Sequence, residues 1–213
     1  MVAVVVAALS AGCGSAAPPI PVTTTSAGHV AVVNPARIER SRAALPDGYE
    51  FAAYQGPPAP VALWGMRVLA VTDPPQCAAL GAPAADASTT RGWSGSGPGG
   101  IAYAMIARKP DGSDPLPSEC ARWTVTAGPT TATVVATPAP VITDAEVVGM
   151  RTDTRTVVEG GTETRLHAET YIASLDDYVC IVSLVTDPGS VQSPLRPDFA
   201  AHLLTETVAA LRG

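Results

Sequence analysis

The three histidines are the side chains in this sequence that can most readily move a proton at neutral pH. His167 lies two residues before Glu169 in a segment that is expected to be a strand, so both side chains would share one face. A histidine held by a carboxylate can act as a general base, but the two residues also fit an ordinary polar pair on a sheet surface. His29 falls in a low-complexity segment and His202 in a C-terminal helix. We therefore predict no catalytic residue and no enzyme activity.

Two glycine-containing motifs have spacings that are used in cofactor binding or catalysis. Residues 95–100 read Gly-Ser-Gly-Pro-Gly-Gly and fit the G-x-G-x-x-G string of dinucleotide-binding loops. That loop must lead into a helix, whereas residues 101–105 alternate as a strand does and Pro98 is unfavourable inside a helix. Residues 92–94 begin a G-x-S-x-G nucleophile elbow, but Ser96 replaces its last glycine. The sequence therefore predicts a hairpin loop and no cofactor.

The three tryptophans, Trp64, Trp93 and Trp123, are candidates for lining a ligand pocket. An indole gives a pocket wall a large apolar surface and one hydrogen-bond donor. Indoles also fill hydrophobic cores, which is the more common arrangement. Both interpretations are open at this point.

The N-terminal residues predict export and a lipid anchor. An apolar run of signal-peptide length ends in Leu9-Ser10-Ala11-Gly12-Cys13, which resembles a bacterial lipobox whose cysteine is acylated. Ser10 stands where an aliphatic residue is usual. We expect residues 1–12 to be a signal peptide, Cys13 to carry acyl chains such as palmitate, and residues 13–29, rich in Pro, Thr and Ser, to form a flexible tether. The protein would then lie outside the cytoplasm, anchored to the cell membrane.

The composition suits one acidic domain. The chain has 213 residues and a net charge of −6 without a basic cluster, so nothing in it is suited to the phosphates of a nucleic acid. No window of about 18 apolar residues occurs, and no transmembrane helix is predicted. Residues 30–213 are enough for a single domain with a sizeable core. The 21 prolines and 19 glycines should divide it into short elements.

Hydrophobic patterning predicts an α+β domain with one twisted antiparallel sheet. A helix should begin at Asn34-Pro35, an N-cap followed by proline, and another should run from 197 to 211. A single helical turn is expected within 73–81, while 61–71 could be helix or strand. Strands are expected at 49–54, 89–94, 101–109, 122–127, 130–137, 147–158, 163–173 and 178–186. The last strand is apolar on both faces, which predicts a central position in a covered sheet.

The cysteines predict one disulfide. If Cys13 is acylated, three cysteines remain, and an exported compartment favours a bridge between two of them. Cys77 and Cys120 lie in loop contexts near proline and form the favoured pair; Cys120 with Cys180 remains an alternative. Cys180 falls in the middle of a strand, where a small buried side chain is sufficient explanation. Their spacings differ from those of zinc ligands, so no metal site is predicted.

Four short motifs resemble a family of mycobacterial cell-envelope lipoproteins of unknown function. They are Asn34-Pro35-Ala36-Arg37-Ile38, Leu45-Pro46-Asp47-Gly48-Tyr49-Glu50, Asp73-Pro74-Pro75-Gln76-Cys77-Ala78-Ala79-Leu80 and Gly92-Trp93-Ser94. More distantly, the Pro-Pro-x-Cys element, Cys120 and the C-terminal helix are similar to the extracytoplasmic sensor domain of PknH-like mycobacterial serine/threonine kinases. That resemblance implies an α+β module with an antiparallel sheet, disulfides and a cleft for a small ligand. The kinase domains carry two bridges, whereas only three cysteines remain here.

These observations predict a lipid-anchored envelope protein whose domain is a ligand-binding or sensor-like module. Its expected partners are the membrane, through the anchor, and a small molecule, lipid or cell-wall component. A docking module for another envelope protein is the first alternative, and it would present an exposed apolar patch. An envelope hydrolase is the second, and it would bring His167 or His202 to a serine or carboxylate in a cleft.

Overall fold

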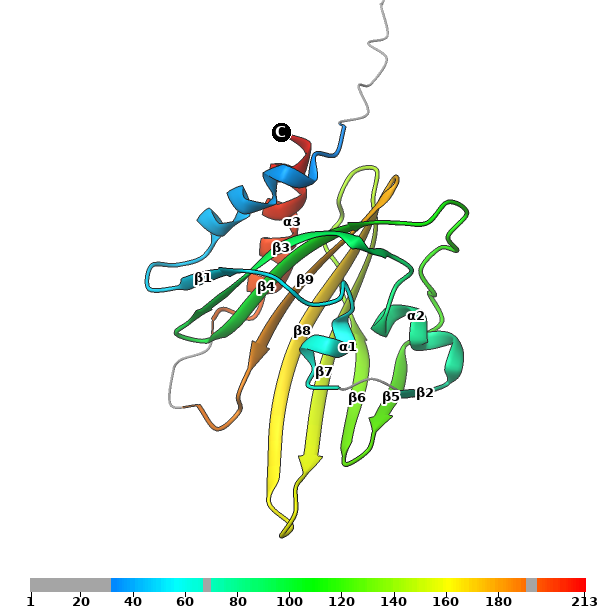
Figure 1. The fold of residues 1–213 in the computed structure, drawn as a ribbon, viewed down its shortest axis with the longest axis vertical. Coiled ribbons are helices and arrows are strands. Elements are labelled where there is room, and N and C mark those ends of the chain that lie inside the picture. Colours follow the sequence, from blue (N-terminus) through cyan, green and yellow to red (C-terminus); the bar gives the residue numbers. More distant parts are fainter. Residues whose placement is uncertain (1–31, 67–69, 191–194) are drawn as a thin grey trace, which may run out of the picture.

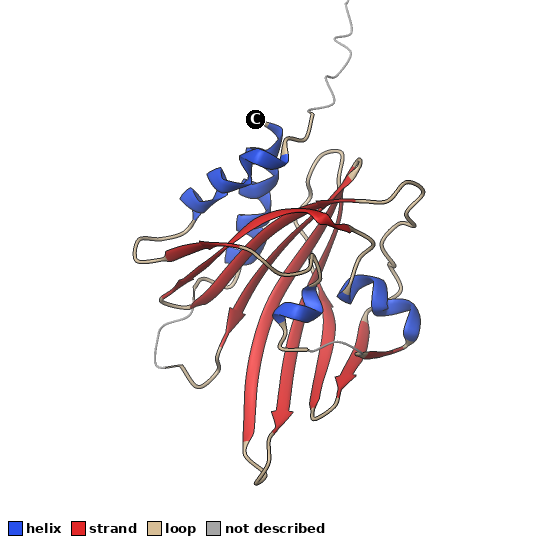
Figure 2. Ribbon diagram, in the orientation of Figure 1, coloured by secondary structure: helices blue, strands red, loops and turns tan. Residues whose placement is uncertain are grey.

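One sheet organises the domain in the computed structural model, which describes residues 32–66, 70–190 and 195–213 (Figures 1 and 2). Within these residues, nine antiparallel strands lie in the order β1-β3-β4-β9-β8-β7-β6-β5-β2. They are β1 Glu50–Ala53, β2 Val71–Asp73, β3 Asp86–Gly97, β4 Gly100–Arg108, β5 Arg122–Ala127, β6 Thr130–Thr137, β7 Glu146–Val157, β8 Glu163–Leu175 and β9 Tyr178–Thr186. The helical elements are the 3-10 helices η1 Pro35–Ala44 and η2 Pro75–Cys77 and the α-helices α1 Pro60–Leu63, α2 Ala78–Gly81 and α3 Phe199–Arg212. The predicted α+β class, with a single antiparallel sheet and helices near both ends of the domain, is confirmed.

The last strand of the chain joins two parts of the sheet. β1, β3 and β4 form one part, and β2 with β5 to β8 forms the other. β9 pairs with β4 along one edge and with β8 along the other. All of its residues are buried except Tyr178 and Thr186 at its ends, which are half-buried. This confirms the interior position predicted from its apolar residues, because a strand covered on both faces has no polar side.

Helices cover both faces of the sheet, and each face has its own hydrophobic core (Figure 1). α1 and α2 lie against one face, where Trp64 belongs to the first core. η1 and α3 lie against the opposite face, where Ile38 and Leu203 belong to the second core. Successive strand residues point to opposite faces, so Ile181 enters the first core and Val182 the second. No helix in the described ranges is long and apolar enough to cross a membrane.

The N-terminal helix begins where the sequence predicts. The Asn34 side-chain oxygen accepts a hydrogen bond from the Ala36 N–H at 3.0 Å, and Pro35 supplies the fixed backbone angle that suits a first helical position. The helix has 3-10 geometry and ends at Ala44, before Pro46. The Asn34 N–H also donates to the Leu211 carbonyl at 2.9 Å, which ties the start of the domain to the end of α3.

Two segments of ambiguous pattern contain short elements. The stretch 61–71, for which helix and strand were both open, contains most of α1 at one end and the first residue of β2 at the other. The expected helical turn within 73–81 consists of η2 followed by α2, which ends at Gly81. A side chain at Gly81 would place its Cβ 2.7 Å from Val61 and 3.3 Å from Trp123, so the close approach of α2 to its neighbours requires glycine.

The glycine-rich motif is a β-hairpin. Residues up to Gly97 belong to β3, Pro98 and Gly99 form the turn, and Gly100 begins β4, as predicted. A Cβ on Gly97 would lie 2.7 Å from the Tyr49 ring, and one on Gly100 would meet the Val185 carbonyl. These two glycines are therefore explained by packing rather than by phosphate binding.

The disulfide joins Cys77 and Cys120, the favoured pair. Cys77 ends η2, next to β2, and Cys120 precedes β5, which pairs with β2. The bridge therefore holds together the two segments at one edge of the sheet. Cys180 is a free, buried cysteine in β9, and burial raises the pKa of its thiol to about 12. Its thiol stays protonated at neutral pH, as expected for a cysteine that packs rather than reacts.

Candidate functional site

The three tryptophans lie in the cores. Trp64, Trp93 and Trp123 expose no more than 1% of their surface, and none is among the residues that line the three cavities described below. The Trp93 indole N–H donates to the Ile38 carbonyl and to the Ser41 hydroxyl, both at 3.1 Å. Of the two interpretations of the tryptophans, pocket lining and core packing, the structure supports core packing. Cys13 lies outside the described residues.

Two neighbouring cavities form a groove around His167 and Thr186, which line both of them. The first cavity has a volume of about 720 Å³ and the second about 480 Å³. The first is lined by Ser96, Gly97, Gly99, Gly100, Ile101, Arg165, Leu166, His167, Val185, Thr186, Asp187, Pro188 and Ser190. The second is lined by Arg151, Asp153, His167, Ala168, Glu169, Leu184, Thr186, Leu195, Arg196 and Pro197. We call the two together the His167 groove. A third cavity, of about 230 Å³, lies apart beside the Asp176-Asp177 turn and has a polar lining.

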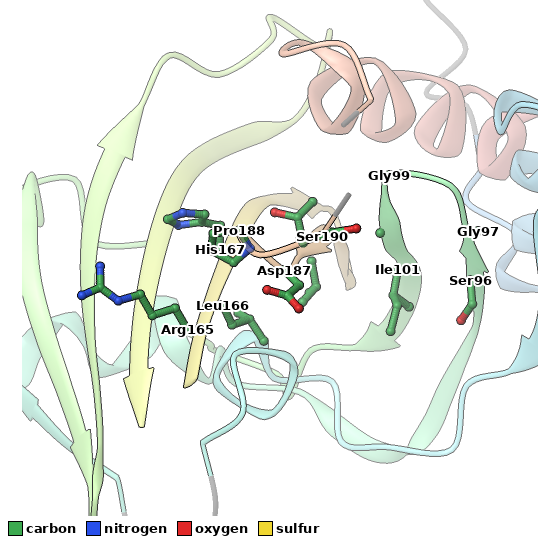
Figure 3. Close-up of a pocket in the computed structure, with 13 residues that line it drawn as sticks. Ser96, Gly97, Gly99, Ile101, Arg165, Leu166, His167, Asp187, Pro188 and Ser190 are labelled. Carbon is green, nitrogen blue, oxygen red and sulfur yellow. The ribbon is translucent and has the colours of Figure 1, made fainter. Parts of the chain in front are cut away.

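A difference in strand length creates the first cavity. β8 pairs with β7 from Glu163 onward, but with β9 only from His167, which lies opposite Thr186. The residues of β8 before His167 therefore extend past the end of β9. Figure 3 shows Arg165 and His167 on one side of the cavity, Ser96 and Ile101 of the β3–β4 hairpin on the other, and Asp187, Pro188 and Ser190 between them.

His167 is held by a neighbouring strand. Its Nδ1 contacts the Asp153 carboxylate on β7, which is the residue directly opposite in the sheet. The sequence had suggested Glu169 as its partner; Glu169 lies two residues further along β8 and faces Arg151 instead, with 4.0 Å between carboxylate oxygen and guanidinium nitrogen. Thus the two predicted residues share a groove but are not paired with each other.

Charge alternates along the rim of the groove. Burial raises the pKa of Glu169, and the nearby Arg151 acts in the opposite direction with a smaller effect. On β8, Arg165 lies 3.6 Å from Glu163, whose pKa is about 2 because the Arg155 guanidinium donates a hydrogen bond to it. Arg196 uses its Nε to contact Asp198 at 3.1 Å. Each cation therefore has an acidic neighbour.

The groove suits binding of an organic molecule. Its walls combine aliphatic side chains with hydroxyl and charged groups that could orient a ligand, and each cavity lies in the usual size range of ligand sites. In the described part of the chain, no three His, Cys, Asp or Glu side chains are grouped as metal ligands would be.

In the described ranges, the large apolar side chains that are exposed come from different parts of the sequence. They are Val32, Phe51, Val71, Val141 and Val158, and they lie on separate segments of the chain. Phe51 and Val71 even occupy opposite edge strands of the sheet. Scattered apolar residues of this kind are normal on a protein surface.

Most residues of the groove could not be found from the sequence. His167 and Glu169 were noticed as a possible pair, but Arg151 and Asp153 enter the same site only because β7 pairs with β8 in one register. For these two residues, the sequence signal was the alternation of charged side chains at positions 151, 153 and 155, which places them on one face of a strand. The end of β9 at Thr186, which opens the first cavity, has no distinct sequence signal.

Comparison with known proteins identifies a family but not an activity. A solved X-ray structure of an uncharacterized protein from Mycobacterium smegmatis (Rv0999 ortholog) is similar, with a TM-score of 0.61 and 19% sequence identity over 85% of this chain and 98% of that chain. This likeness concerns the fold alone. No curated protein matches the chain. A family model described as a domain of unknown function (DUF5642) matches residues 34–212. The chain therefore belongs to the DUF5642 family, which confirms the expected family of unknown function.

Proposed function

We propose that this protein is a lipid-anchored binding protein of the cell envelope, with a sensor-like domain that takes a small organic ligand in the His167 groove. The observation that carries the proposal is the pair of adjoining cavities, about 720 and 480 Å³, that share His167 and Thr186. Volumes of this size are typical of sites for small organic molecules. Its role is binding without catalysis, with His167 held in place by Asp153.

The attachment of the tether supports this arrangement. The described chain enters the domain near Asn34, whose N–H is hydrogen-bonded to the Leu211 carbonyl close to the C-terminal end of α3. The groove lies near the other end of that helix, because Leu195, Arg196 and Pro197 line its second cavity. The 14 residues of α3 span about 21 Å at 1.5 Å each. A ligand could therefore enter the groove without passing the tether.

Blocking the groove should abolish ligand capture. Thr186→Trp places a bulky side chain at the junction of the two cavities, while Thr131→Trp introduces the same side chain at an exposed strand position outside them. Native mass spectrometry of protein purified from its host envelope is expected to show a bound molecule in the wild type and in Thr131→Trp, but not in Thr186→Trp. Equal occupancy of all three proteins, or an empty wild type, would contradict the groove as a binding site.

The anchor is tested independently. The wild-type protein is expected to fractionate with membranes. Its processing should be blocked by globomycin, because globomycin inhibits the signal peptidase that cleaves lipoproteins before their acylated cysteine. Cys13→Ala should leave the membrane fraction, whereas Ser15→Ala should remain there. If Cys13→Ala stays membrane-bound to the same extent, Cys13 is not the anchor.

A further inference from the structure

Among the described residues, the lining of the His167 groove contains aliphatic, hydroxyl and charged side chains but no Phe, Tyr or Trp. We propose that its ligand is an anionic amphiphile, in which one aliphatic chain occupies the first cavity and a carboxylate or phosphate head binds between Arg151 and Arg196 in the second. This inference rests on the proposed binding function and specifies its ligand class.

The first cavity has an aliphatic wall. Ile101 and Val185 lie directly opposite each other on β4 and β9, and Leu166 of β8 lines the same cavity. By alternation all three point to the face that carries the first core, to which Val185 belongs and against which Leu166 packs. The next residues of β8 and β9, His167 and Thr186, point to the opposite face, so the first cavity is lined from both faces at the end of β9. An aliphatic chain in contact with them removes apolar surface from water, which is the main source of affinity for such a chain.

The second cavity has two guanidinium groups with donors to spare. Arg151 lies 4.0 Å from Glu169, which is beyond hydrogen-bond distance, and its side chain is 61% exposed. Arg196 contacts Asp198 through Nε alone, so its two terminal nitrogens are not used in that contact. Guanidinium groups bind carboxylates and phosphates strongly because they offer several donors in one plane. These two side chains therefore favour an anionic head.

The acidic side chains of the same cavity repel an anion less than their number suggests. The Asp153 carboxylate already contacts Nδ1 of the His167 ring. Burial raises the pKa of Glu169, which disfavours its charged form. The two arginines remain charged at every physiological pH.

The dimensions favour a long ligand over a simple ion. Arg151 lies opposite Glu169, and Arg165, at the far side of the first cavity, lies opposite Arg155. These two rows are four residues apart along antiparallel strands, a distance of about 14 Å. A molecule that reaches from Arg151 to the far side of the first cavity spans that distance, which an acyl chain does and an isolated phosphate or acetate does not. Flat aromatic ligands gain most from walls of Phe, Tyr or Trp, none of which is among the described residues that line this groove.

The test measures displacement of fluorescent cis-parinarate from the purified full-length protein by three probes. Palmitate and 1-palmitoyl-lysophosphatidate carry an anionic head, as a free acid and as a phosphate monoester, and methyl palmitate has the same chain without a charge. Both anionic probes are expected to bind at least tenfold more tightly than the ester. If only one of the two anionic probes binds, that result shows whether the head of the ligand is a carboxylate or a phosphate, and it supports the proposal.

Substitutions then distinguish the contribution of the anionic head to binding from that of the aliphatic chain. Arg151→Gln and Arg196→Gln should each weaken both anionic probes about tenfold and leave the ester unchanged, because each removes one charge-assisted contact worth about 1.4 kcal/mol or more. Arg155→Gln is the matched control: it lies on the same strand, outside both cavities, and should leave the binding of all three probes unchanged although it removes the contact with Glu163. Leu166→Ser should weaken all three probes alike, with circular dichroism used to verify that the variant is folded.

The outcomes distinguish this inference from the proposed function. If none of the probes binds, but Thr186→Trp loses a molecule that the wild type captures, the groove is a binding site and the amphiphile assignment is wrong. If the ester binds as tightly as the acids, or if Arg155→Gln weakens binding as much as Arg151→Gln, the role given to the two arginines is wrong. If the probes do not bind and the wild type carries no molecule, both proposals fail.

Discussion

Replacing both Cys77 and Cys120 by alanine should lower the free energy of unfolding by about 4 kcal/mol. The disulfide closes a loop of 43 residues, and the chain-entropy model assigns a stabilisation of that size to such a loop. This is a large part of the stability of an ordinary domain, so the double variant should unfold at a much lower urea concentration. Urea denaturation followed by circular dichroism measures the difference.

The control for this variant is Cys180→Ala. It removes a buried sulfur without opening a covalent loop, so it reports the packing loss alone. It should be clearly more stable than the double variant. If the two proteins unfold at the same urea concentration, the stabilisation comes from packing rather than from the cross-link.

Trp64→Ala should destabilise the domain by about 3–5 kcal/mol, the range observed for truncating a large buried aromatic side chain. Trp64 is fully buried, lies 5.9 Å from the Trp123 ring centre, and donates a hydrogen bond from its indole N–H to the Thr170 hydroxyl at 3.1 Å. Thr170 in turn shares a hydrogen bond with Ser183 on β9. The side chain thus links α1 to the middle of the sheet, and thermal denaturation should show the loss directly.

Trp64→Phe separates the two contributions of that side chain. Phenylalanine keeps an aromatic ring in the core but cannot donate to Thr170, so a smaller loss, on the order of 1–2 kcal/mol, is expected. Binding of any groove ligand should be unaffected in Trp64→Phe, because Trp64 does not line the cavities. A loss of ligand binding with unchanged stability would show instead that Trp64 belongs to a ligand pocket.

Long segments with regular patterns were predictable from the sequence. The β5–β6 hairpin has the predicted bounds because β-branched residues dominate both arms and Gly128 marks its turn. β9 was identified as an interior strand because apolar side chains point to both faces. Of the two edge strands, β1 lies within the predicted strand 49–54, whereas β2 was harder because its three residues are too few for a periodic pattern.

The site depended on pairing between distant segments, which local patterns do not specify. Arg151 and Arg196 are 45 residues apart and meet only through the fold. The tryptophans illustrate the opposite problem: an indole has the same sequence signal in a pocket wall and in a core. Only the packing of α1 and α2 on the sheet decides the position of Trp64 and Trp123.

The position of β9 also determines the order in which this domain can be completed. A chain that emerges from a ribosome or a secretion channel with its N-terminus first presents β4 and β8 before β9, and both strands then have an edge without its final partner. Unpaired strand edges promote association between chains, and pairing of distant segments slows folding. The nine residues from Tyr178 to Thr186, together with α3, must therefore be available before the nascent sheet can close. A chaperone that shields those two edges until the end of synthesis would be of direct benefit to this fold.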